Sequence, residues 1–186
     1  MLTFRPTRSF LITPKNNQEY NREKGGVIVT SSIENAKDVN RFGIIKKTPL
    51  YYDGDLIEGD EVVLHHNVFR SYYDMKGCER KSKEYFKDNL YLVDESKIYL
   101  VKTKKGYLSF DDYCFVSPKG EENLEVSLGS YELHKGTVKF VNPNIINQGI
   151  EEGMEVGYTK DSEYEFEIEG ELLYRMKRKD ICVKFF

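Results

Sequence analysis

The sequence predicts an all-β protein made of two similar units, each a small barrel or sandwich. Short apolar or alternating segments of strand length recur along the chain, among them RSFLITP, FGIIKK, DEVVLHH, KIYLVK, GTVKFV and DICVKFF. Gly, Pro, Asn or Asp residues separate these segments, as expected for strands joined by turns. Tyr and Phe, which favour strands, number 14 and 11. Only residues 32–39 and 78–87 have a pattern that allows a helical turn or two.

The bulk composition is that of an ordinary soluble protein. The formal net charge is −3, which gives no general attraction to nucleic acid or to an acidic membrane. No run approaches the roughly 18 apolar residues that span a bilayer, and the basic start of the chain does not resemble a signal peptide. Three widely spaced cysteines, Cys78, Cys114 and Cys182, are expected to be free thiols in a reducing compartment. We therefore expect a soluble, cytoplasmic protein.

An internal repeat is the strongest organisational signal in the chain. EGDEV at 58–62 aligns with EGMEV at 152–156 at an offset of 94 positions, and the same offset places Pro49 over Pro143. LITP at 11–14 aligns with FVSP at 115–118 at an offset of 104. LY at 90–91 aligns with LY at 173–174 at an offset of 83, as do Ile98 and Ile181. Chance similarity between two β-rich stretches is the alternative, but the common register of glycine, glutamate and prolines favours duplication.

The changes in offset predict where the two copies differ. We expect one domain at 1–103 and a second at 104–186, with the boundary in the sequence VKTKKGY. Between Pro14 and Pro49 the first copy has ten more residues than the second has between Pro118 and Pro143. A second insertion of about eleven residues, the difference between the offsets 94 and 83, lies between Val62 and Leu90 and includes 74–89.

Five segments of the first copy, in the right order, resemble the co-chaperonin (GroES-like) family, whose members cap barrel-shaped chaperonins. FRPTRSFLITPK resembles the first strand of that family, and KGGVIVTSS resembles its mobile loop, with paired glycines before an aliphatic tripeptide. FGIIKKTP, LIEGDEVVLHH and LYLVDESKIYLV resemble the strands that follow. The resemblance covers about residues 1–102. The second copy resembles the family mainly through the first.

This resemblance implies two tandem GroES-like β-barrels and a set of contact residues. The first barrel has a mobile-loop-like segment at 16–32, and the second is degenerate and lacks the loop. The chaperonin-binding residues implied are Gly25, Gly26, Val27, Ile28 and Val29. Rings in the family form where the last strand of one subunit meets the first strand of the next. That geometry implies a homo-oligomeric ring with contacts at Phe4, Phe10, Ile98 and Leu100.

Two features depart from the family. Tandem co-chaperonins usually keep the loop in both copies, and this chain has only the short turn LYYDGD where the family has a roof hairpin. In addition, the resemblance implies rings of seven barrels, and chains with two barrels each always give an even number. The second copies therefore form a separate tier, or the ring number differs.

The loop has the physical properties that such binding requires. NNQEYNREK at 16–24 has no apolar periodicity, and Gly25-Gly26 relaxes the backbone beside the aliphatic residues. Three consecutive β-branched side chains at 27–29 form a stiff extended segment. Burying one such side chain contributes on the order of 1.5–3 kcal/mol before ordering costs. The alternative is that Val27-Ile28-Val29 is a core strand of the barrel.

No catalytic or metal-binding signature is present, so we expect neither an enzyme nor a cofactor. Known nucleotide, hydrolase and metalloprotease motifs are absent. His65 and His66 are expected on opposite faces of a strand, where they cannot share one metal. Turn formation explains the carboxylates Asp53, Asp55, Glu58 and Asp60. The basic, aromatic segment 76–87 is interpreted as a solvated hairpin tip, with nucleic-acid binding as the alternative.

Two functional hypotheses remain from the sequence. The first is a co-chaperonin-like lid that binds a chaperonin ring and assists folding without catalysis. The second is a structural protein of a phage particle, a capsid or tail component in which the same barrel contacts neighbouring virion proteins. The first predicts a cytoplasmic protein and the second a virion protein. Neither involves a membrane, and nucleic acid is not an expected partner in either.

Overall fold

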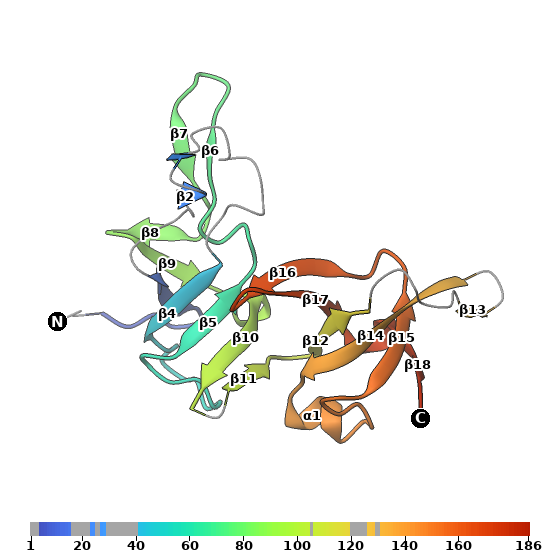
Figure 1. The fold of residues 1–186 in the computed structure, drawn as a ribbon. Coiled ribbons are helices and arrows are strands. Elements are labelled where there is room, and N and C mark those ends of the chain that lie inside the picture. The colour runs from blue at the N-terminus through green and yellow to red at the C-terminus, as the bar shows by residue number, and fades with distance from the viewer. Residues whose placement is uncertain are drawn as a thin grey trace. The chain divides into compact units, whose positions relative to one another are not determined.

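The computed structural model describes residues 4–15, 23–24, 27–28, 41–104, 106–119, 126–128 and 131–186, which divide into two compact units. The first unit comprises Met1–Gly106 and the second Tyr107–Phe186. The prediction of an all-β chain is confirmed. In the described residues the single α-helix is the four-residue α1 (Pro143–Ile146), and all other regular elements are strands or short 3-10 turns (Figure 1).

The first unit is built on one antiparallel sheet with the strand order β11-β10-β5-β4-β1-β9-β8. The strands that lie within the unit are β1 (Phe10–Pro14), β4 (Phe42–Lys47), β5 (Glu61–Leu64), β8 (Tyr85–Lys87), β9 (Leu90–Val93) and β10 (Ile98–Thr103). The edge strand β11 (Gly106–Ser109) starts at the last residue of the unit, and its other residues belong to the second unit. Two further pairs form separate two-stranded sheets, β2 (Glu23–Lys24) with β3 (Val27–Ile28) and β6 (Ser71–Tyr73) with β7 (Glu79–Lys81). All five residues of β1 are buried, so this central strand supplies much of the core.

The second unit has a sheet with the order β16-β17-β12-β14-β15-β18. Its strands are β12 (Tyr113–Pro118), β14 (Tyr131–Phe140), β15 (Glu155–Thr159), β16 (Tyr164–Ile168), β17 (Glu171–Lys177) and β18 (Ile181–Lys184), with β13 (Val126–Leu128) paired to β14. Its core includes Cys114, Val138, Val156 and Met176, all buried. Burial, followed by the charges of Asp112 and Asp180, raises the pKa of the Cys114 thiol to about 12, which keeps it protonated and unreactive.

The two sheets have the same pairing pattern. β1, β4, β5, β8, β9 and β10 of the first unit correspond in order and partners to β12, β14, β15, β16, β17 and β18 of the second. Pro14 lies opposite Gly43 and Pro118 opposite Gly136, and both strand pairs have a register irregularity three residues before the proline. A short turn precedes the last strand in each unit, η2 (Glu95–Lys97) before β10 and η3 (Arg178–Asp180) before β18.

The shared EGxEV sequence forms the same turn in both units. Gly59 and Gly153 both have positive φ, +100° and +85°, a conformation that glycine adopts without a steric cost. The Gly59 amide donates to Ile45 O at 2.8 Å, and the Gly153 amide donates to Val138 O at 2.8 Å. The glutamate of each motif also pairs with a lysine at the end of the first strand, Glu61 with Lys15 and Glu155 with Lys119. The matching sequence therefore marks a matching structural position.

The sequence pattern allowed a helical turn in two regions, and the structure describes only one of them. Residues 78–87 contain β7 and β8 instead of a helix, while 32–39 lie outside the described residues. The helix α1 was not anticipated, although its signals are local. Asn142 caps it by accepting from the Ile145 amide at 3.0 Å, and Pro143 occupies its first turn.

Candidate functional site

The segment 16–32 contains one described feature, a short antiparallel strand pair. Glu23 of β2 lies opposite Ile28 of β3, and Lys24 lies opposite Val27, so the two strands are joined by Gly25-Gly26. This pair is a two-stranded sheet of its own and is not part of the path β11 to β8. Val27 and Ile28 are therefore not strand residues of the main sheet. Gly25, Gly26 and Val29, the other predicted chaperonin-binding residues, lie outside the described residues.

The corresponding connection of the second unit is arranged differently. Between β12 and β14 the strand β13 pairs with β14 in the register Val126 opposite Leu133 and Leu128 opposite Tyr131. This hairpin continues β14, which itself pairs with β15 over Leu133 to Thr137. In the second unit the connection is thus attached to the main sheet, whereas β2 and β3 of the first unit pair only with each other in the described residues.

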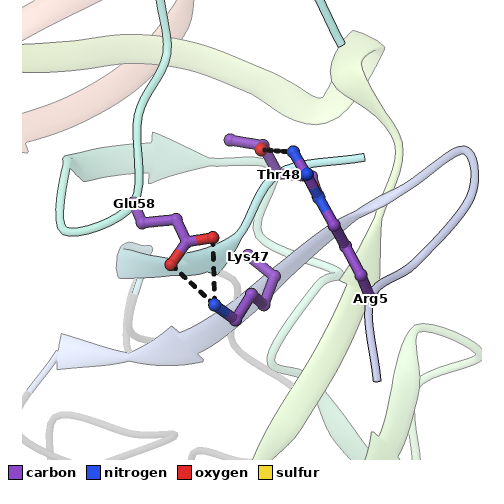
Figure 2. A network of polar contacts seen from close by, with 4 residues as sticks. All are labelled: Arg5, Lys47, Thr48 and Glu58. Atoms are coloured by element: carbon purple, nitrogen blue, oxygen red, sulfur yellow. Dashed lines mark hydrogen bonds and ion pairs between the residues drawn. The ribbon is translucent and has the colours of Figure 1, made fainter. Parts of the chain in front are cut away.

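The opening of the chain is fixed against the end of β4. Arg5 donates from Nε to Thr48 O at 3.0 Å and from Nη2 to Thr48 Oγ1 at 2.7 Å (Figure 2). The Leu50 amide donates to Pro6 O at 2.9 Å. In the same region Lys47 Nζ lies 2.9 Å from Glu58 Oε2 (Figure 2). The Arg-Pro dipeptide therefore anchors the segment that leads into β1.

The four predicted oligomer-contact residues occupy two kinds of position. Phe10, Ile98 and Leu100 are fully buried in the core of the first unit. Phe4 is partly buried, and its ring packs edge-on against Phe86 of β8 at a centroid distance of 5.4 Å. In the single chain all four side chains pack within the first unit.

The expectation that His65 and His66 point to opposite faces of a strand is wrong. The strand β5 ends at Leu64, so the two residues lie in the following turn and the alternation of a strand does not apply. Their rings stack with centroids 4.3 Å apart. The Asn67 amide donates to His65 Nδ1 at 3.0 Å. Among the described residues, no group of three or more His, Cys, Asp or Glu side chains is placed to hold a metal ion.

The carboxylates between residues 53 and 60 lie in the connection between β4 and β5, and two of them make contacts that hold this connection. Asp60 Oδ2 accepts from the Ile57 amide at 2.9 Å, and Glu58 pairs with Lys47. Asp53 and Asp55 are exposed.

The insertion of the first unit forms a long hairpin, β6–β7, which projects from the main sheet (Figure 1). Asp74 organises its tip: Oδ1 accepts from the amides of Lys76 and Cys78 at 2.9 and 3.0 Å, and Oδ2 pairs with Arg80 at 3.0 Å. The hydrogen bonds from the Cys78 amide and the Arg80 guanidinium hold the pKa of Asp74 below its ordinary value. The carboxylate that closes the tip is therefore ionised at neutral pH.

Sequence reasoning missed one buried charge pair, Glu84 with Lys97. Glu84 precedes β8 and is 5% exposed, and its carboxylate pairs with the ammonium of Lys97 in η2. The two residues are thirteen positions apart and no local pattern links them. The sequence shows only that each residue of the pair is a charged residue next to an apolar strand, and it does not show that the two meet.

Comparison with known proteins adds no assignment. No model of a protein family matches the chain, and no curated protein matches it. Within the described ranges, no helix has the length and apolar character to cross a membrane.

Proposed function

We propose that the chain is a co-chaperonin-like lid protein with two tandem GroES-like barrels. The first barrel binds a chaperonin ring through residues 25–29, and the protein assists folding without catalysis of its own. The same proposal includes a homo-oligomeric ring, with the lid formed by several copies. Support comes from the sequence resemblance of the first unit and from the common strand order of both units.

The placement of Val27 and Ile28 is the observation that carries the proposal. A β-branched pair inside the main sheet would have packed in the core and been unable to leave it. These two residues instead form a separate two-stranded sheet with β2. A strand pair outside the main sheet can bind a partner without breaking a ladder of that sheet.

The binding strength expected of each loop is modest. Burial of two or three aliphatic side chains contributes on the order of 1.5–3 kcal/mol each, and ordering a polar segment offsets much of this gain. A ring that presents one loop per subunit raises the overall affinity through effective concentration. A weak individual contact is therefore compatible with tight, reversible capping.

Replacing Ile28 with aspartate is expected to abolish chaperonin binding. The charged side chain would have to be desolvated in an apolar groove, which costs several kcal/mol per site and is multiplied over the ring. Binding is measured by co-sedimentation with the chaperonin of the producing cell and by suppression of its ATPase. The matched control is Val126→Asp, a β-branched residue of β13 in the corresponding connection, which should bind like the unmodified chain.

Capping by Ile28→Asp at unchanged affinity would overturn the proposal, and so would equal loss in both variants. Recovery of the protein in stoichiometric amounts from purified virions, with no chaperonin binding by the unmodified chain, would identify it as a structural component of a phage particle instead.

A further inference from the structure

The two units carry opposite net charge. From 1 to 106 the chain has 19 Lys and Arg against 15 Asp and Glu, a formal charge of +4. From 107 to 186 it has 9 against 16, a formal charge of −7. The overall value of −3 therefore conceals a basic unit linked to an acidic one. Such an asymmetry favours contact between unlike units and disfavours contact between like units.

The β6–β7 hairpin carries part of the positive charge of the first unit. Residues 70–83 contain five basic residues, Arg70, Lys76, Arg80, Lys81 and Lys83, against two acidic ones. The hairpin also exposes large apolar side chains. Tyr72 is 45% exposed, Tyr73 is 55% exposed, and Met75 at the tip is fully exposed. An element with exposed aromatic and Met side chains among cations has the composition of a binding surface.

This hairpin is pre-organised and firmly attached. Asp74 and Gly77, which has a φ of +73°, close the tip. At the base, Ser82 Oγ donates to Val68 O at 2.6 Å, and the buried Phe69 packs edge-on against Tyr91 at 4.8 Å. Little conformational entropy is lost when such an element binds.

The negative charge of the second unit has its densest run on the β16–β17 hairpin. Glutamate occupies every second position from 163 to 171. Phe166 and Ile168 of β16 are buried, which leaves Glu165 and Glu167 on the exposed face at the edge of the sheet. Leu172 of β17 lies opposite Glu167 in the ladder and is 46% exposed. This face, residues 165, 167 and 172, is named here the acidic edge.

We propose that the β6–β7 hairpin of one copy docks on the acidic edge of a second copy of this chain. Met75 and Tyr73 cover Leu172, while Lys76 and Lys83 lie against Glu165 and Glu167; Tyr72 points to the other face of β6. The occupant is a second copy because the chain itself supplies a surface of opposite charge with an apolar centre. A polyanion such as nucleic acid is disfavoured because the attached second unit, at −7, repels it.

The contact joins two different surfaces, so it is heterologous and propagates from copy to copy, as a ring where the rotation closes and as an open filament where it does not. It involves neither the segment 16–32 nor the residues Phe4, Phe10, Ile98 and Leu100. It therefore goes beyond the proposed lid function and can fail separately from it. The Ile28→Asp variant should retain this association.

A charge-swap experiment on the full-length chain tests the proposal. One variant carries Lys76→Glu with Lys83→Glu, and the other Glu165→Lys with Glu167→Lys. Each alone is expected to associate at least about tenfold more weakly than the unmodified chain in sedimentation velocity, because like charges then face each other. An equimolar mixture should recover association, because each hairpin again meets an edge of opposite charge. Raising salt from about 0.1 to about 1 M should weaken the native contact.

Two matched controls test for nonspecific charge effects, Lys46→Glu with Lys104→Glu and Glu151→Lys with Glu152→Lys, all at exposed positions. They should associate like the unmodified chain. The proposal is overturned if the unmodified chain is monomeric at all concentrations, which is also the result expected if the hairpin docked within its own chain. It is overturned as well if the mixture of the two variants fails to recover association. It is also overturned if Lys76→Glu with Lys83→Glu leaves association intact but abolishes binding of a single-stranded oligonucleotide, which would identify the hairpin as a nucleic-acid surface.

Discussion

Gly136→Ala is expected to destabilise the second unit by about 1–3 kcal/mol or more, as overpacking of a closely packed site does. A Cβ at this position would lie 2.4 Å from Val116 Cγ1 and 2.8 Å from Ser117 O. The carbonyl belongs to the neighbouring strand backbone and cannot rotate away, so β12 and β14 would have to separate. Gly43→Ala should destabilise the first unit by overpacking against side chains instead of backbone, since its Cβ would lie 2.6 Å from Cγ2 of the fully buried Ile12.

These two glycines occupy equivalent positions, opposite Pro118 and Pro14. The free energy of unfolding is measured by urea denaturation followed by circular dichroism, because the chain has no tryptophan. Lys46→Ala, an exposed change on the same strand as Gly43, is the control and should stay within about 0.5 kcal/mol of the unmodified chain. A Gly136→Ala variant as stable as that control would contradict the close packing of β12 on β14.

Lys97→Met is expected to cost about 3–5 kcal/mol, because it leaves the buried carboxylate of Glu84 without its cation. Glu84→Gln should cost less, since the side chain of Lys97 is 21% exposed against 5% for that of Glu84. Glu84→Leu combined with Lys97→Met should recover most of the loss, because neither member of the pair then remains charged. A double-mutant cycle with Glu84→Leu and Lys97→Met as its single variants, followed by urea denaturation, measures the coupling. A coupling energy near zero would show that the pair does not hold the insertion to η2.

Much of the strand arrangement could be predicted because glycines and prolines mark fixed positions. The offset of 104 between LITP and FVSP reappears in the ladder positions of β1 and β12, with the same irregularity. The offset of 83 relates Ile98 and Ile181, which open the last strands. These residues are constrained by local backbone geometry, which a sequence pattern can record.

The features that could not be predicted depend on where a strand stops or on distant partners. The rings of His65 and His66 can stack because β5 ends at Leu64, the residue before them. The sequence DEVVLHH does not mark this strand end, because its apolar run is followed by no Gly or Pro. The ion pair of Glu84 with Lys97 joins an insertion to a turn and has no local signature. For the candidate site, residues 27 and 28 could be singled out because KGGVIVTSS resembles the mobile loop of the co-chaperonin family. Their separation from the main sheet could not, since a β-branched pair fits either location.

Site-specific cross-linking tests the central claim, that the segment around Ile28 contacts a chaperonin, most directly. A photo-reactive residue replaces Ile28 in one preparation of the full-length chain and Val126 in another, and each is irradiated with the chaperonin ring. Peptide mass spectrometry then identifies the partner of each adduct. The account predicts chaperonin adducts in apolar groove peptides from position 28 and none from position 126. Adducts from position 28 that join only copies of this chain, with no chaperonin peptide, would contradict it.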